Sequence, residues 1–377
     1  MHRLLAALAV TLFALPPVAA SAAGEAWVPG PSVQGVFDLG GPRSDGSIVT
    51  AWSGGVALLN SGTGASTFAP GYKAEANAAE AYLAVSPGLH VAQAGCDFPL
   101  DETYILRLHA PIGITRVDKT GSMVTPFANV PVQGLNGITF DTTGTFGHRL
   151  LVTAPVSGKT QIAAIDCKGG VEFLTRTAPA MEGGLAVAPA TFGSFGGALI
   201  APDEVSGKTY AVAPDGTSTQ VVSSGLPAGG DIGVESVAFV PAGFTRGGYL
   251  YYSDRATPGN PHPGTDHILR LSSSDLVAAG VQEGDLLAAS EGGASMIGVR
   301  CDTSCRVFTV VGTPTTAHGE GHLVFATTQV ASPSPPLRLP PSQPTAANNA
   351  ANTAIRILAV LAVISVAAWL LLTRRRS

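Results

Sequence analysis

The sequence predicts an all-β fold, a six-bladed β-propeller, and three observations support it. Short apolar or alternating runs fill the body of the 377-residue chain, and glycine, proline, asparagine and aspartate separate them. No long stretch of helical periodicity interrupts this pattern, which is typical of all-β proteins. One apolar run recurs six times, and the loops around two of its copies recur in register.

The recurring run sets the expected number of blades. Six segments align on it: QGVFDL at Gln34, AYLAVSP at Ala81, NGITFD at Asn136, GGLAVAP at Gly183, ESVAFVP at Glu235 and SMIGVRC at Ser295. Their third residues stand 47, 55, 47, 52 and 60 positions apart. A four-stranded blade takes about 40 to 50 residues before loop insertions. We therefore expect each run to be the first, innermost strand of a blade.

The loops repeat together with the strands. Three pairs of equivalent residues each stand 49 positions apart: Phe146 and Phe195, Ser157 and Ser206, and Asp166 and Asp215. A looser third copy begins at Gly243, and a strand near Ala26 to Val28 is expected to complete the last blade and close the ring. Five or seven blades remain as alternatives, since the first and last units are the least similar.

The N-terminal segment predicts export. Residues 1–22 combine a short basic start, an apolar stretch over 4–15 and the small-x-small sequence Ala20-Ser21-Ala22. This pattern is typical of a cleaved signal peptide. The propeller is then expected over residues 25–330.

The C-terminal segment predicts a membrane anchor. A proline-rich stalk is expected over residues 331–353, a transmembrane helix over 354–373 and a basic cytoplasmic tail over 374–377. The arginines at 374–376 favour the cytoplasmic side. A cell-wall sorting signal is the alternative, but Leu339-Pro340-Pro341-Ser342-Gln343 departs from the Leu-Pro-x-Thr-Gly pattern. The sequence therefore predicts a single-pass protein of the cell membrane with its body outside, in a bacterium by its alanine-rich, lysine-poor composition.

Charge excludes one class of partner. Between the two apolar ends the chain carries 16 basic and 26 acidic residues, a net charge of −10. No basic stripe is available for phosphates, so no nucleic-acid partner is expected. The excess of acidic residues agrees better with cation binding, or with solubility alone, than with nucleic-acid binding.

Four cysteines in an exported chain are expected to pair. Cys301 and Cys305 flank a short turn between two apolar runs, which predicts a disulfide across a hairpin. Cys96 and Cys167 have no local partner, and the sequence leaves their pairing open.

The repeat layout resembles the six-bladed propellers of the gluconolactonase and regucalcin-like superfamily, and more loosely the NHL-type and streptogramin-lyase-like propellers. The resemblance covers about residues 25–330. It implies a divalent cation, Ca²⁺ or another, at one mouth of the central channel. It also implies glutamate, asparagine and aspartate ligands and an acidic general base that acts on a lactone or ester.

The first strand of each propeller blade lines the channel, so residues just before the apolar runs converge at one mouth. Asn136 in NGITF matches the family's Asn-Gly at the start of an inner strand. In the next blade Gly183 stands where the family has an acidic residue, and the acid, Glu182, is displaced by one position. The candidate metal ligands are Asn136, Glu182, Glu235 and Glu80.

The loops between second and third strands are expected on the same face as this mouth, where they would form a binding surface. The sequence AHGEGH at Ala317 lacks the His-Glu-x-x-His order of zinc enzymes, and its glycines favour a solvated loop. The binding-face candidates are Asp97, Asp101, Glu102, Asp203, Glu204, Asp254, His267, His318, Glu320 and His322.

No nucleophile elbow, Walker loop or dinucleotide fingerprint is present in the sequence. The first functional hypothesis is a membrane-tethered module that binds a small molecule, a glycan or a protein. The alternative is a divalent-metal-dependent lactonase or related hydrolase at the channel mouth, and a streptogramin-lyase-like eliminase is a third.

Overall fold

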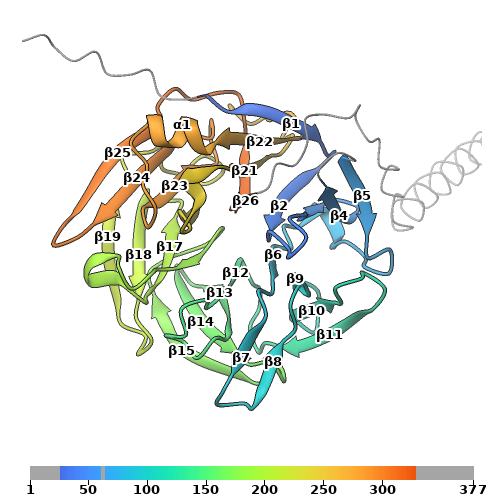
Figure 1. Cartoon of the computed structure of the whole chain (residues 1–377). Coiled ribbons are helices and arrows are strands. Elements are labelled where there is room, and N and C mark those ends of the chain that lie inside the picture. The colour runs from blue at the N-terminus through green and yellow to red at the C-terminus, as the bar shows by residue number, and fades with distance from the viewer. Residues whose placement is uncertain (1–25, 61–63, 328–377) are drawn as a thin grey trace, which may run out of the picture.

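Six antiparallel four-stranded sheets surround a central axis in the computed structural model (Figure 1), which describes residues 26–60 and 64–327. Each sheet packs its faces against its two neighbours, so apolar side chains on both faces are buried. The predicted six-bladed propeller is confirmed.

Four blades are built from strands that follow one another from the axis outward, apart from one inserted hairpin. Blade 1 contains β2 (Val36–Gly40), β3 (Ile48–Trp52), β4 (Gly55–Asn60) and β5 (Gly64–Phe68). Blade 2 contains β6 (Leu83–Val85), β9 (Thr103–Arg107), β10 (Gly113–Val117) and β11 (Val124–Asn129). Blade 3 contains β12 (Gly137–Phe140), β13 (Leu150–Val156), β14 (Lys159–Ile165) and β15 (Val171–Ala178). Blade 4 contains β16 (Ala186–Val187), β17 (Leu199–Asp203), β18 (Lys208–Val212) and β19 (Ser218–Ser223).

The inserted hairpin projects from blade 2 and is fastened to blade 3. It consists of β7 (Leu89–Val91) and β8 (Cys96–Phe98), and Cys96 forms a disulfide with Cys167, just after β14. Because 71 positions separate these cysteines, the bridge stabilises the fold by about 4 kcal/mol in the chain-entropy model. The predicted Cys301–Cys305 disulfide is also present.

Blades 5 and 6 exchange strands. Blade 5 contains β20 (Val234–Phe239), β23 (Leu286–Ser290), β24 (Met296–Cys301) and β25 (Cys305–Val311). After β20 the chain first crosses into blade 6, where it forms two strands, and only then returns to build the rest of blade 5. From the axis outward, blade 6 contains β26 (Gly319–Ala326), β21 (Tyr249–Asp254), β22 (His267–Ser272) and β1 (Val28–Ser32).

This exchange corrects two expectations. The run at Ser295 is the third strand of blade 5, and the innermost strand of blade 6 is β26. The segment from Gly243 does not continue blade 5, since β21 pairs with β26 and β22. Alignment of apolar runs assumes that a blade is continuous in sequence, and run composition does not reveal which strands hydrogen-bond. The expected N-terminal closing strand is present as β1, paired with β22.

Four short helices lie between strands of the described chain. They are η1 (Ala76–Ala78), η2 (Gly193–Phe195), η3 (Phe244–Arg246) and α1 (Ser273–Ala278). Within the part of the chain that the structure describes, no helix is both long and apolar enough to cross a membrane. The predicted signal peptide, stalk, transmembrane helix and basic tail lie outside the described residues.

Trp27 packs at the point where the ring closes. Its Nε1 donates to the Ala294 carbonyl at 2.7 Å, and its ring lies 6.0 Å from that of Tyr252. We predict that Trp27→Ala lowers the free energy of unfolding by about 3 to 5 kcal/mol, because it removes a buried aromatic ring and leaves a cavity. Urea titration followed by circular dichroism measures this. Val28→Ala is the matched control, because Val28 is 47% exposed. Equal midpoints for the two variants would show that Trp27 does not stabilise the closure.

Candidate functional site at the acidic channel mouth

A cavity of about 420 Å³ lies where the inner strands of four blades begin or the second strands end. Its titratable lining comprises seven carboxyl groups, one arginine, one histidine and one tyrosine. These are Glu80, Glu182, Glu204, Asp231, Glu235, Glu291, Glu320, Arg255, His318 and Tyr82. The carboxyl groups therefore greatly outnumber the basic groups at this mouth.

The propeller geometry explains why these residues meet. Inner strands start at this mouth, and second strands, which run antiparallel to them, end there. Starting segments supply Glu80 and Tyr82 before β6, Glu182 before β16, Glu235 in β20, and His318 and Glu320 at the start of β26. Residues just after second strands supply Glu204, Arg255 and Glu291.

Three of the four candidate metal ligands line the cavity, and the fourth lies beside it. Asn136 supports Glu182: its Nδ2 donates to the Met181 carbonyl at 3.1 Å, and its side chain also hydrogen-bonds to Glu182. Gly183 has φ +72°, and a Cβ there would lie 1.9 Å from the Glu235 carbonyl oxygen. No side chain fits at Gly183, so the preceding residue, Glu182, contributes the acid of this blade.

Glu182, Glu204 and Glu291 form a chain of hydrogen-bonded carboxyl groups. Burial, followed by the neighbouring Glu204 carboxyl, raises the pKa of Glu182 to about 7. Burial and the hydrogen bond to Glu291 raise the pKa of Glu204 to about 8. Burial is also the main cause that raises the pKa of Glu291 to about 7. Two carboxyl groups can hydrogen-bond only if they share a proton, so this chain holds protons near neutral pH.

A second cluster is centred on Tyr82. The Tyr82 hydroxyl lies 2.9 Å from Glu235 Oε1 and 2.7 Å from Glu320 Oε1. Burial and neighbouring carboxylates raise the pKa of both glutamates well above its usual value. Arg255 pairs with Glu80 and lies 3.6 Å from Glu320, so one guanidinium offsets part of the negative charge.

His318 joins the two clusters. Its Nε2 lies 2.8 Å from Glu291 Oε1 and 3.7 Å from Glu320 Oε2. Burial, and then the charge of Arg255, lower the pKa of His318. The AHGEGH segment is therefore not the solvated loop that the sequence predicts. From Gly319 it is an inner strand, and His318 and Glu320 are each at most 3% exposed.

Further along β26, a hydrogen-bonded tie crosses the channel. His322 Nδ1 lies 2.8 Å from Asp38 Oδ1, and its Nε2 lies 2.8 Å from the Ile138 carbonyl oxygen. Beyond this tie the second mouth is an apolar cavity of about 390 Å³, whose lining includes Leu185 and Phe325. Among the described residues, the carboxyl groups that line a channel cavity thus lie at the acidic mouth.

Glu204, His318 and Glu320 are the binding-face candidates that line the acidic cavity. The rest of that set lies elsewhere: Asp97, Asp101, Glu102, Asp203, Asp254, His267 and His322. Several of these have local structural partners. Asp101 accepts from the Ser44 backbone at 2.7 Å, Glu102 from the Tyr104 hydroxyl at 2.9 Å, and Asp254 from the His318 backbone at 2.8 Å.

Sequence reasoning missed four titratable lining residues: Tyr82, Asp231, Arg255 and Glu291. Glu291 follows β23, a strand that the repeat alignment did not recognise because it assigned the next strand to the channel. Arg255 directly follows the candidate Asp254, so the same loop rule would have found it. Tyr82 is the second residue of the apolar run that begins at Ala81, so the sequence pattern did not distinguish it from the core residues of that run.

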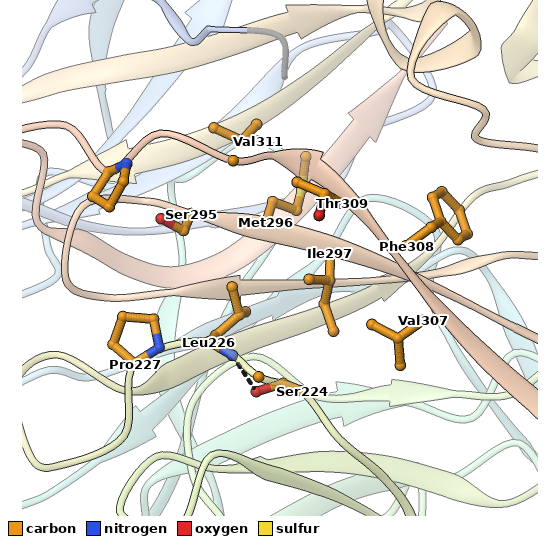
Figure 2. Close-up of a pocket in the computed structure, with 13 residues that line it drawn as sticks. Ser224, Leu226, Pro227, Ser295, Met296, Ile297, Val307, Phe308, Thr309 and Val311 are labelled. Atoms are coloured by element: carbon orange, nitrogen blue, oxygen red, sulfur yellow. Dashed lines mark hydrogen bonds between the residues drawn. The ribbon is translucent and has the colours of Figure 1, made fainter. Parts of the chain in front are cut away.

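A different cleft, of about 360 Å³, lies between blades 4 and 5 (Figure 2). Its wall includes Leu226, Met296 and Ile297, and the Leu226 backbone donates to Ser224 Oγ at 3.1 Å. None of its lining residues is acidic, basic or histidine. The acidic channel mouth is therefore the better candidate for chemistry.

No protein-family model matches the chain, and no curated protein sequence matches it. Solved structures to which the fold is similar include the nidogen/laminin complex, at 11% identity over 76% of this chain and 84% of that chain, with a TM-score of 0.45. Virginiamycin B lyase from Staphylococcus aureus shows 13% identity over 80% and 95%, with a TM-score of 0.43. A putative gluconolactonase shows 14% identity over 60% and 71%, with a TM-score of 0.34. A virginiamycin B lyase and a putative gluconolactonase, two of the protein classes that the sequence resembles, are thus among the similar solved structures.

The raised pKa values predict how stability depends on pH. In the unfolded chain these glutamates titrate near 4.5, whereas in the fold Glu182, Glu204 and Glu291 titrate near 7 to 8. Between about pH 4.5 and 8 the folded state therefore binds more protons than the unfolded chain. The stabilisation that these protonated glutamates contribute is complete below pH 4.5, and it is lost as the pH rises through 7 to 8. The lowered pKa of His318 has the opposite effect on stability, but only below pH 6.5, the usual pKa of a histidine.

We predict that the free energy of unfolding, measured by urea titration with EDTA present, falls between pH 6.5 and 8. Glu204→Gln should reduce this slope, because its amide cannot ionise. Glu172→Gln is the control, since Glu172 is 67% exposed on blade 3. A stability that stays constant or rises over this range would contradict the burial of protonated carboxyl groups.

Proposed function

We propose that the protein is a divalent-cation-dependent hydrolase that opens a lactone or a related ester at the acidic channel mouth. The observation that carries this proposal is the convergence of seven carboxyl groups on one cavity with a single arginine. Burying like charges without a counter-charge destabilises a fold, and clusters of perturbed carboxyl groups are most often functional.

The lining residues fit a divalent cation. Carboxylate oxygens bind divalent cations, and Glu291 and Glu320 project into one cavity from blades 5 and 6, with Glu204 of blade 4 beside them. Burial is the main cause that raises their pKa values. When bound, a divalent cation would polarise a carbonyl group or acidify a water molecule.

The remaining residues have distinct roles in this proposal. Glu182 is the candidate general base, because it is only partly buried and its pKa of about 7 suits proton transfer at neutral pH. The side chain of Asn136 orients it. Tyr82 holds Glu235 and Glu320 in position, and Arg255 limits the net charge.

A binding role, without turnover, is the second candidate. The lining includes no serine or cysteine nucleophile, only the hydroxyls of Tyr82 and Thr257. A cation-loaded mouth could then hold a hydroxyl- or carboxylate-bearing ligand such as a glycan. Turnover distinguishes the two candidates.

We also propose that the propeller is exported and tethered to the cell membrane through its C-terminus. The support is the sequence alone: a signal-peptide pattern over residues 1–22 and an apolar stretch over 354–373 followed by arginines. On this proposal the propeller works outside the cytoplasm.

For the hydrolase, we predict that the purified full-length protein in detergent cleaves members of a lactone and aryl-ester panel, and that EDTA abolishes the activity. Glu182→Gln should lower kcat by about 100-fold or more, the usual contribution of a general base. Glu172→Gln, outside the cavity, should leave kcat unchanged. Cation binding without turnover of any substrate would favour the binding role, and turnover that resists EDTA would exclude a cation mechanism.

For the tether, we predict that the full chain stays in the membrane pellet after alkaline carbonate washing, because its apolar segment is inserted. A chain that ends at residue 330 should be released from the membrane in soluble form. Recovery of the full chain in the carbonate supernatant would contradict a membrane-spanning anchor.

A further inference from the structure

Two histidines, His318 just before β26 and His322 within it, differ in how their ring nitrogens are satisfied. Both nitrogens of His322 have partners, as expected for a structural histidine. His318 is only 2% exposed, yet its Nδ1 has no hydrogen-bond partner among the described residues. Its Nε2 is directed at two glutamates and belongs to the wall of the cavity. His318 therefore has the surroundings of a ligand-binding group.

The ligand atoms of His318, Glu291 and Glu320 are mutually close. One ligand atom from each lies within 4.8 Å of the other two, a spacing that one metal ion can span. All three residues are buried, since Glu291 is 7% exposed and the other two less.

The backbone fixes this group. The Gly319 N–H donates to the Glu291 carbonyl at 2.7 Å, and an antiparallel bridge joins Gly292 to His318. His318 and Glu320 stand two positions apart, so they project from the same face of the chain. The three ligands thus come from two paired segments whose register is set by main-chain hydrogen bonds.

We infer that Glu291, His318 and Glu320 bind a transition-metal ion of the Zn²⁺, Mn²⁺ or Fe²⁺ class, in preference to Ca²⁺ or Mg²⁺. The inference deepens the proposed function, on which it rests, by naming the cation. An imidazole nitrogen with two carboxylates suits these metals and leaves coordination positions open. Ca²⁺ takes six to eight oxygen ligands and gains little from a nitrogen.

The surrounding charges agree with this assignment. Arg255 lies 3.6 Å from Glu320 and offsets part of the negative charge beside the three ligands. Glu204 hydrogen-bonds to Glu291 and is itself oriented by the Ile232 backbone, which donates to Glu204 Oε1 at 3.2 Å. Glu204 is placed to orient the metal-binding carboxylate.

The test uses metal-stripped full-length protein in detergent and two readouts that need no activity. Calorimetric titration should give Zn²⁺ and Mn²⁺ affinities at least about 100-fold above that of Ca²⁺. Bound Co²⁺ should show visible absorption bands of a site with a nitrogen ligand. His318→Gln should weaken Zn²⁺ binding by more than the roughly 100-fold upper range of an outer-shell substitution.

The matched control is His90→Gln, because His90 forms an exposed pair with Asp97 and lies outside the cavity. Its metal affinity should equal that of the unsubstituted protein. Circular dichroism and melting curves establish that each variant is folded. If His318→Gln does not fold, X-ray absorption of the zinc-loaded unsubstituted protein decides, because an imidazole ligand has a distinctive scattering pattern.

The outcomes separate the metal assignment from the hydrolase proposal. Tighter binding of Ca²⁺ than of Zn²⁺, or Zn²⁺ binding that is indifferent to His318→Gln, would overturn the metal assignment even if Ca²⁺-dependent hydrolysis is found. Zn²⁺ binding that depends on His318, without hydrolysis of any substrate, would support the metal assignment and count against the hydrolase.

Discussion

The Asp38 carboxylate holds the propeller together at its axis. It is fully buried in blade 1 and accepts hydrogen bonds from the backbone N–H groups of Leu39 at 2.8 Å, Leu83 at 2.6 Å and His322 at 2.8 Å, as well as from His322 Nδ1. A buried carboxylate is tolerated only with such partners. It thereby joins the inner strands of blades 1, 2 and 6, and His322 Nε2 extends the tie to blade 3. Gly321 makes the approach possible, since a Cβ there would lie 2.4 Å from Asp38 Oδ1.

The same tie determines where the candidate site is built. The last described strand, β26, closes the ring, and Asp38 fixes its position through His322. His318 and Glu320 precede His322 in the chain and lie nearer the acidic mouth, and the pairing register of β26 shifts between Glu320 and Val324. Main-chain hydrogen bonds from β26 to the segment after β23 then bring Glu291 beside them. The strand that closes the ring, β26, therefore also positions the residues of the candidate site.

Repeat spacing was sufficient to predict the propeller, its six blades, the N-terminal closing strand and the position of three site glutamates at a common mouth. It failed where blades 5 and 6 exchange strands, because apolar periodicity reports that a strand is buried but not which strand it pairs with. That error assigned β24 to the channel in place of β26, and so His318 and Glu320 were interpreted as residues of a loop. Glu291 was overlooked for the same reason. Gly183 shows a different limit: its clash with Glu235 depends on contact between blades, which single-sequence reasoning does not reveal.

The pKa values of His318, just before β26, and His322, within it, are shifted in opposite directions. Burial alone would lower the pKa of both. For His318 the nearby Arg255 adds to this effect, and the pKa falls. For His322 the Asp38 carboxylate and the Ile138 carbonyl oxygen outweigh burial, and the pKa rises. Both ring nitrogens of His322 take part in the tie across the channel, whereas His318 faces the carboxyl groups of the acidic cavity. Arg255 and Asp38, at different points along the channel, thus shift the pKa values of the two histidines in opposite directions.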